Sequence, residues 1–197
     1  VWGRTNHRGE PVTLLEGPAV VAGAAAAGLI APGVPGRMRA AALLAGAGSG
    51  VLGGYDDLAG SGASRGFKGH LAALARGEVT SGAVKILGIG ATGLAAAAVA
   101  GSPAPSRTGR AFDTLLNGAI IAGSANLMNL FDLRPGRAVK VGLIAGTPLA
   151  LTRSGSAVVA APLGAAAALL PEDLGERAML GDTGANALAE VLGEQRG

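Results

Sequence analysis

The chain has 197 residues, of which 49% are apolar and only 15% charged, with a net charge of +3 and no cysteine. A typical soluble domain carries about 25% charged residues, so this composition favours a membrane protein. An Ala/Gly-rich soluble helical protein is the alternative, but the charge-free stretches are too long and too regularly spaced for it. The absence of cysteine excludes disulfides and cysteine-based metal sites. No run of consecutive Lys or Arg occurs and aromatic residues make up 3%, so we expect no nucleic-acid partner.

Apolar stretches separated by polar connections run through the whole chain and predict membrane-spanning helices. These stretches cover residues 17–31, 39–55, 81–101, 112–131, 139–152 and 155–170, and a further one begins near residue 183. Several are shorter than the roughly 20 residues of a perpendicular span, which fits either short Ala/Gly helices inside a bundle or half-spanning helices. We therefore predict an all-α fold, a polytopic transmembrane helical bundle. Residues 1–197 would form a single membrane-embedded domain, and we expect the chain to be a fragment at both ends.

The polar connections sort the charged residues between the two membrane faces, if every apolar stretch crosses. The face that carries residues 1–16, 56–80, 132–140 and 171–182 holds most of the Arg and Lys, and the positive-inside rule makes it cytoplasmic. Four aspartates fall on this same face: Asp56, Asp57, Asp132 and Asp182. Acids beside apolar spans are costly unless they are solvated, paired or bound to a cation. Their convergence predicts a functional site, although any one of them alone would be read as the place where a helix leaves the bilayer.

The pair Asp56–Asp57 and the isolated Asp182 are the candidates for cation chemistry. Adjacent carboxylates repel, so one of them has a raised pKa unless a cation neutralises the pair. Carboxylates together with water and a substrate phosphate are the usual ligands of Mg²⁺ in proteins. Asp182 lies between Gly181 and Thr183, where a helix is expected to begin, so an ordinary helix cap is its alternative role.

A second polar pattern lies at the end of the stretch 112–131, where Asn126, Asn129 and Asp132 recur every three residues. This spacing places them on about one helical face. Amides in an apolar helix either join helices together or meet a polar substrate, and the sequence leaves both roles open. Lys68 and His70 follow the acidic pair as a candidate clamp for a pyrophosphate and a candidate proton carrier. A basic flank and a structural histidine are the alternatives.

The ordered series of these motifs resembles a known family. It consists of Arg4-Thr5-Asn6 with Pro11-Val12-Thr13, then Asp56-Asp57, then Asn126, Asn129 and Asp132, then Met179-Leu180-Gly181-Asp182-Thr183-Gly184. The chain is similar to the polyprenyl-phosphate N-acetylhexosamine-1-phosphate transferases, the glycosyltransferase family 4 enzymes that include the phospho-N-acetylmuramoyl-pentapeptide transferase. The likeness covers nearly the whole chain as an ordered series of short motifs.

The resemblance implies a transferase of cell-wall biogenesis in the plasma (inner) membrane, with multiple membrane passes. Polyprenyl phosphate would attack the β-phosphate of a UDP-sugar at the cytoplasmic face, with Mg²⁺ as cofactor. Asp56, Asp57 and Asp132 are then expected to be catalytic, and Asp182 to bind the metal. The residues expected at the substrate are Asn126, Asn129, Lys68, His70 and Arg134. Membrane lipid would surround the protein, and a homodimer is left open.

One departure from the family pattern bears on function. Members usually carry a second Asp three residues after the position of Asp132, where this chain has Pro135. Arg134 is a candidate compensating phosphate contact. The departure favours an alternative from another class, a catalytically impaired relative that binds a lipid carrier or a partner protein in the membrane. A small transporter ranks last, because its acids would lie near the bilayer midplane.

Overall fold

The helices follow the apolar stretches of the sequence. The computed structural model describes residues 2–6, 8–30, 32–59, 66–152 and 156–193. The helices in this part of the chain are α1 (Glu16–Ile30), α2 (Gly36–Ala59), α3 (Gly66–Ala75), α4 (Ser81–Ala100), α5 (Arg107–Phe131), α6 (Arg137–Ala150), α7 (Ser156–Leu174) and α8 (Gly181–Gly193). The all-α prediction is confirmed, and each predicted apolar stretch coincides with one helix. The expected turn at 153–154 lies outside the described residues.

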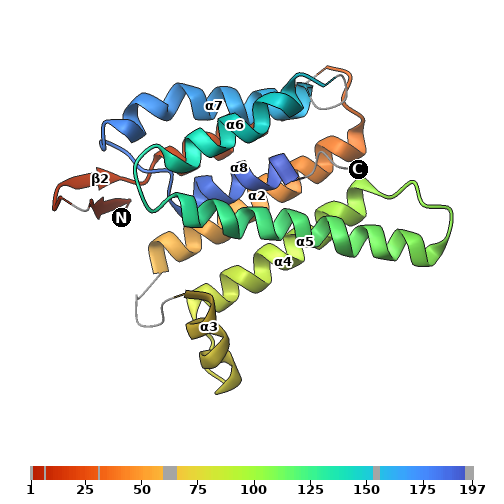
Figure 1. The fold of residues 1–197 in the computed structure, drawn as a ribbon, viewed down its shortest axis with the longest axis horizontal. Coiled ribbons are helices and arrows are strands. Elements are labelled where there is room, and N and C mark those ends of the chain that lie inside the picture. Colours follow the sequence, from red (N-terminus) through yellow and green to blue (C-terminus); the bar gives the residue numbers. More distant parts are fainter. Residues whose placement is uncertain (1, 7, 31, 60–65, 153–155, 194–197) are drawn as a thin grey trace.

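Two segments expected to be plain connections have structure of their own. Residues before α1 form a hairpin in which β1 (Gly3–Thr5) pairs antiparallel with β2 (Pro11–Thr13). The connection between α2 and α4 contains α3, which projects away from the other helices (Figure 1). Both departures lie at the same end of the bundle as the predicted aspartates.

Helix boundaries follow from local chemistry. Thr80 accepts a hydrogen bond from the Ala83 amide and starts α4, and Ser106 does the same with Gly109 at the start of α5. Such side-chain oxygens satisfy amides that have no partner within the helix. Gly101 ends α4 at a φ of 81°, in the left-handed region that glycine enters without steric cost.

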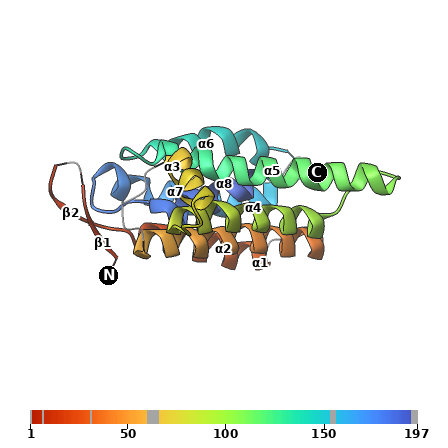
Figure 2. The same cartoon turned by 90° about the horizontal axis from the view of Figure 1, so that it is seen from below.

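The long helices run up and down, side by side, with α8 at the centre (Figures 1 and 2). Helix α8 packs against α1, α2, α5, α6 and α7. One end of the bundle therefore carries the last turns of α2, α5 and α7 and the first turns of α1, α4, α6 and α8. We call it the acidic end, because the carboxylates described below lie there.

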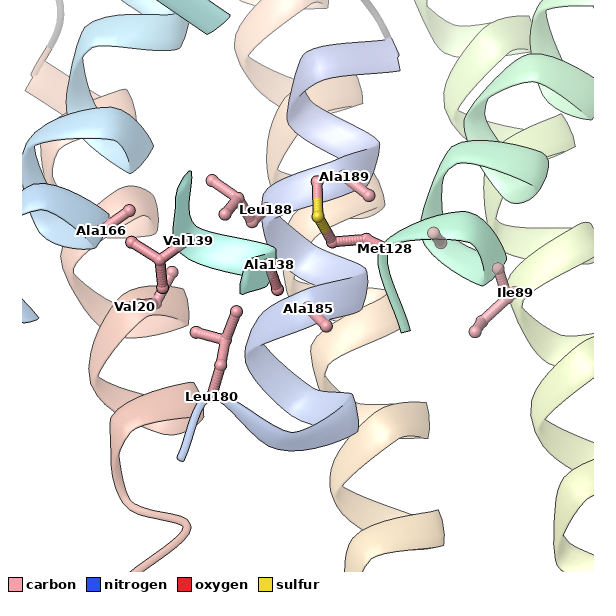
Figure 3. Packing of buried hydrophobic residues seen from close by; sticks show 11 residues of the cluster. Val20, Ile89, Met128, Ala138, Val139, Ala166, Leu180, Ala185, Leu188 and Ala189 are labelled. Carbon is pink, nitrogen blue, oxygen red and sulfur yellow. The ribbon is translucent and has the colours of Figure 1, made fainter. Parts of the chain in front are cut away.

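Small and branched side chains fill the space around α8 (Figure 3). Leu180, Ala185, Leu188 and Ala189 of this segment are buried in one cluster with residues of the surrounding helices. The other members of that cluster are Val20, Ile89, Ala125, Met128, Ala138, Val139 and Ala166. Because many of these side chains are alanine, the helix axes approach closely, as the composition predicts.

The closest approach joins α2 to the start of α8. A Cβ atom added to Gly53 would clash with the Asp182 carbonyl and would lie 2.7 Å from the Thr183 amide nitrogen. At this position only glycine lets the backbones of the two helices meet. The contact carries directly into the acidic end, because Asp56 and Asp57 follow in the next turn.

By length and hydropathy together, α4 is the single helix among the described residues that could cross a membrane, and the apolar α1 is shorter. Large apolar side chains are nevertheless exposed on several other helices. They include Val51, Leu87, Phe112, Leu115, Leu130 and Ile144, each more than half exposed.

The glycine contact yields a stability prediction. Gly53→Ala should lower the free energy of unfolding by about 1–3 kcal/mol or more, because the added methyl group meets the backbone of α8. The matched control is Gly90→Ala in α4, where an added Cβ meets nothing within 4 Å. There alanine should be neutral or stabilise by about 0.5–1 kcal/mol. Thermal unfolding followed by circular dichroism measures both, and equal effects of the two substitutions would contradict the prediction.

Candidate active site

The structure brings the predicted aspartates together at the acidic end. Asp56 and Asp57 lie in the last turn of α2, Asp132 directly follows α5, and Asp182 lies in the first turn of α8. Residues 126 positions apart in sequence make hydrogen bonds here. The four carboxylates expected on one membrane face thus occupy one end of the bundle.

Asp57 ties α2 to α8. Its carboxylate accepts hydrogen bonds from the Asp182 amide at 3.2 Å and from the Thr183 amide at 3.0 Å. It also accepts from the Thr183 hydroxyl at 2.8 Å. The first amides of a helix have no partner within the helix and attract negative charge. The Asp57 side chain is 6% exposed and acts as a cap on α8.

The N-terminal hairpin braces the same junction. Arg4 donates a hydrogen bond of 2.8 Å to the Asp57 carbonyl. Thr13, in β2, exchanges backbone hydrogen bonds with the segment before α8, accepting from the Met179 amide at 2.9 Å and donating to the Arg177 carbonyl at 3.3 Å. The loop leading to Asp182 is therefore held from both sides.

Lys85 is the cation of the site, and the sequence analysis did not select it. Its ammonium group lies 2.6 Å from an Asp182 carboxylate oxygen and 3.6 Å from an Asp56 oxygen. The side chain is 11% exposed. A lysine within an apolar helix such as α4 was the available signal, because an intramembrane charge is costly without a partner.

Asn129 completes the surroundings of Lys85. Its amide is assigned with the oxygen towards Lys85, at 2.8 Å from the ammonium nitrogen, and with the NH₂ group towards Asp182, at 3.2 Å. The reverse orientation would set the oxygen against acceptors and the NH₂ group against an ammonium. An ammonium has three donors, and the three acceptors are Asp56, Asp182 and Asn129. Asn186, one turn further along α8, lies 3.0 Å from the Asn129 amide nitrogen.

The two carboxylates around Lys85 differ in their proton affinity. Burial raises the pKa of Asp182 to about 6, against the opposing charge of Lys85. Burial also acts to raise the pKa of Asp56, but hydrogen bonds with Asp182 and Ser81 and the charge of Lys85 outweigh it, so this pKa lies below the usual value. Two close acids with separated pKa values suit a site where one accepts and the other holds a proton or a cation.

A second acidic group surrounds Asp132. Burial, together with the charges of Asp173 and Asp182, raises the pKa of Asp132 to about 8. Asp173 is 2% exposed and accepts a hydrogen bond from the Gly136 amide at 3.1 Å. Glu16 is 2% exposed, and neither of its carboxyl oxygens has a hydrogen-bond partner among the described residues. Burial and the nearby Asp173 raise the pKa of Glu16 to about 8.

These acids border a hollow of about 120 Å³ beneath the hairpin. Its wall includes Asp132, Arg134, Pro135 and Asp173. Pro135 brings no carboxylate here, but the carboxylate of Asp173 reaches the adjacent Gly136 from α7. A buried acid from another helix therefore stands close to the position where the sequence pattern lacks one.

The remaining predicted residues divide into near and distant ones. His70 of α3 hydrogen-bonds the Thr80 hydroxyl at 2.9 Å, and its ring lies against Gly82 at the start of α4. Asn126 is exposed and, with Lys85, lines a hollow of about 190 Å³ between α4 and α5. Arg134 is exposed at the other hollow. Lys68 belongs to α3, but its side chain lies outside the described residues.

The carboxylates fit the protein's share of a magnesium site. Mg²⁺ is usually held by one or two carboxylates, with water and substrate phosphate completing its coordination. Asp56 and Asp182 offer that pair, and the raised pKa of Asp182 shows that Lys85 neutralises it incompletely. Within the described part of the chain, no group of three or more His, Cys, Asp or Glu side chains is placed to enclose a metal by itself. The residues suit a metal that arrives with a phosphate ligand.

Comparison with protein-family models, with curated proteins and with solved structures finds no match to this chain.

Glu16 yields a prediction about pH. The pKa of Glu16 is about 8 in the folded protein and near the ordinary value of 4.5 when unfolded. Between these values only the folded state keeps the proton, so the free energy of unfolding falls by about 1.4 kcal/mol per pH unit as the pH rises. Below pH 4.5 this group has no effect.

Glu16→Gln removes this proton without removing the side chain's size. We expect the variant to gain stability relative to the wild type as the pH rises from 5 to 8, with the difference vanishing near pH 4.5. Melting temperatures measured across this range provide the test. Parallel pH profiles for the two proteins would show that Glu16 is ionised in the folded state.

Proposed function

We propose that the chain transfers a sugar-1-phosphate from a UDP-sugar to polyprenyl phosphate at the cytoplasmic face of the plasma membrane. The observation that carries the proposal is the single cluster of Asp56, Asp182, Lys85 and Asn129, drawn from four different helices to one end of the bundle. Phosphoryl transfer needs mainly positioning and neutralisation of charge, and this cluster offers acids for a metal together with a fixed ammonium.

The exposed apolar surface supports a polytopic membrane protein. Ile144 of α6 is 74% exposed, Val51 of α2 72%, and Phe112 of α5 64%. Exposed apolar surface of this kind marks contact with lipid or protein. The charged groups described above lie at the acidic end, beyond the apolar stretches, so the outward faces of the helices would meet the hydrocarbon core.

The chemistry follows from the positions of the side chains. A phosphate oxygen of the lipid attacks the β-phosphorus of the UDP-sugar, the new P–O bond forms, and the bond to the bridging oxygen breaks. UMP leaves with the bonding electrons. Lys85 faces the added negative charge, and Asp56, with its low pKa, accepts a proton from the lipid phosphate if it arrives protonated. When bound, Mg²⁺ neutralises the pyrophosphate, with Asp182 and Asp56 as its protein ligands.

The hollow between α4 and α5 supports a lipid acceptor. Lys85 and Asn126 provide its polar part, and Ile86, Ile89 and Ala122 provide an apolar wall. A phosphate beside Lys85 would thus continue into an apolar chain that runs along these helices towards the bilayer interior.

A second candidate function is a membrane protein that binds the lipid carrier without turnover. Two observations favour it. Pro135 stands where the resembled enzymes carry an acid, and the carboxylate of Asp57 is already occupied by three hydrogen bonds to the start of α8. Such a protein would retain the cation of the site, Lys85, and would bind phosphate without transferring it.

A transferase assay tests the first proposal. The purified protein is incubated with Mg²⁺, polyprenyl phosphate and a panel of radiolabelled UDP-sugars. We expect a lipid-linked product with at least one sugar, and a loss of about 10²–10³-fold in rate for Asp182→Asn, the loss expected when one charge-stabilising group is removed. Asp113→Asn is the matched control, because Asp113 lies at the opposite end and pairs with Ser102.

A binding measurement separates the two candidates. If the wild type gives no product with any sugar, but binds polyprenyl phosphate, and Lys85→Met abolishes that binding, the carrier-binding function is supported and the transferase is refuted. Product formation that is unaffected by Asp182→Asn would place the chemistry elsewhere in the molecule.

A further inference from the structure

Asn186 is buried beneath the proposed site, where nothing in the apolar packing requires an amide. Its side chain is 0% exposed, and it lies one turn after Asp182 on the same helix. Its neighbours in α8 include the fully buried Ala185 and Leu188. Burying an amide costs free energy unless its groups are hydrogen-bonded, so a hydrophobic residue would pack here at lower cost.

The only partner that the structure gives the Asn186 amide, within the described residues, is Asn129. The Asn129 NH₂ group lies 3.0 Å from the Asn186 oxygen, whereas the Asn186 nitrogen is buried without a hydrogen-bond partner. The pair is therefore incompletely satisfied, and the energetic cost of Asn186 is balanced by what it does to Asn129.

The contact fixes which way the Asn129 amide faces. An amide can rotate by half a turn and exchange its oxygen and nitrogen positions. The Asn186 oxygen, together with an Asp182 oxygen, accepts from the Asn129 NH₂ group, and this turns the Asn129 oxygen towards Lys85 at 2.8 Å. With the amide reversed, Lys85 would lose its third acceptor and face an NH₂ group.

We propose that Asn186 is a positioning residue, which orients Asn129 and through it holds the Lys85 ammonium between Asp56 and Asp182. The inference rests on the proposed function for its catalytic meaning, because Lys85 is the cation of that site. The arrangement itself is a property of the protein without substrate, so it can be tested separately.

The test measures the chemical reactivity of Lys85. The purified protein is treated with trace acetic anhydride, and acetylation is quantified by mass spectrometry, with the exposed Lys140 in the same chain as internal reference. In the wild type the ammonium is held by its three acceptors, and Lys85 should react far more slowly than Lys140. In Asn186→Leu the ratio of Lys85 to Lys140 acetylation should rise about tenfold, as expected when one hydrogen bond to a charge is lost.

Two further variants separate positioning from packing. Asn186→Asp keeps an acceptor oxygen in the same place, and should retain the slow reaction of Lys85. Asn117→Leu makes the same change about three turns away on α5, and should leave the ratio unchanged. If Asn186→Leu does not fold, Asn186→Ala takes its place in the comparison. An unchanged ratio in a folded Asn186→Leu or Asn186→Ala variant overturns the proposal.

The transferase assay adds a second, independent readout. If the wild type is active, Asn186→Leu should lower kcat while KM for the UDP-sugar changes little, since Asn186 would not touch the substrate. If the wild type shows no transfer, the proposed function fails, while the acetylation ratio still decides whether Asn186 positions Lys85.

Discussion

The capping of α8 by Asp57 is the interaction on which the rest of the site depends. One carboxylate from the end of α2 accepts both the Asp182 and the Thr183 amides, so two helices far apart in sequence meet end against end. The absence of a side chain at Gly53 lets their backbones approach closely enough for this contact. Once α8 begins at this place, Asp182 faces Lys85 of α4 and Asn186 lies beneath Asn129 of α5. Without it, these polar groups would be separate and each would be costly to bury.

The acidic end carries more negative charge than its own cations neutralise. Lys85 lies between Asp56 and Asp182, yet the pKa of Asp182 remains raised to about 6, and those of Asp132 and Glu16 to about 8. Evolution does not keep buried, poorly compensated acids for stability, because replacing them by apolar residues is often neutral or stabilising. Their presence at one end of the bundle is therefore best explained by a ligand that brings positive charge or hydrogen-bond donors with it.

Much of this arrangement could be predicted from the sequence, and the rest shows where such reasoning ends. Apolar stretches of helical length predicted the helices, and their alternation predicted that Asp56, Asp132 and Asp182 would share one end. Helix polarity needs only the order of the elements. Lys85 and Asn186 were missed because they stand singly within apolar helices. Their importance comes from the neighbouring helix faces, and a single sequence does not specify how those faces are rotated.

The hairpin and the pairing of its second strand with the loop before α8 were also missed, for a related reason. Strands of three residues have too little alternation to be recognised, and their hydrogen bonds depend on a segment some 165 residues away. The role of Asp57 changed for the same cause. The sequence places it beside Asp56 as one acidic pair, but the two side chains of neighbouring helix residues point in different directions. Asp57 turns to the α8 amides and Asp56 to Lys85, so the adjacent acids divide into one that builds the site and one that is free to act in it.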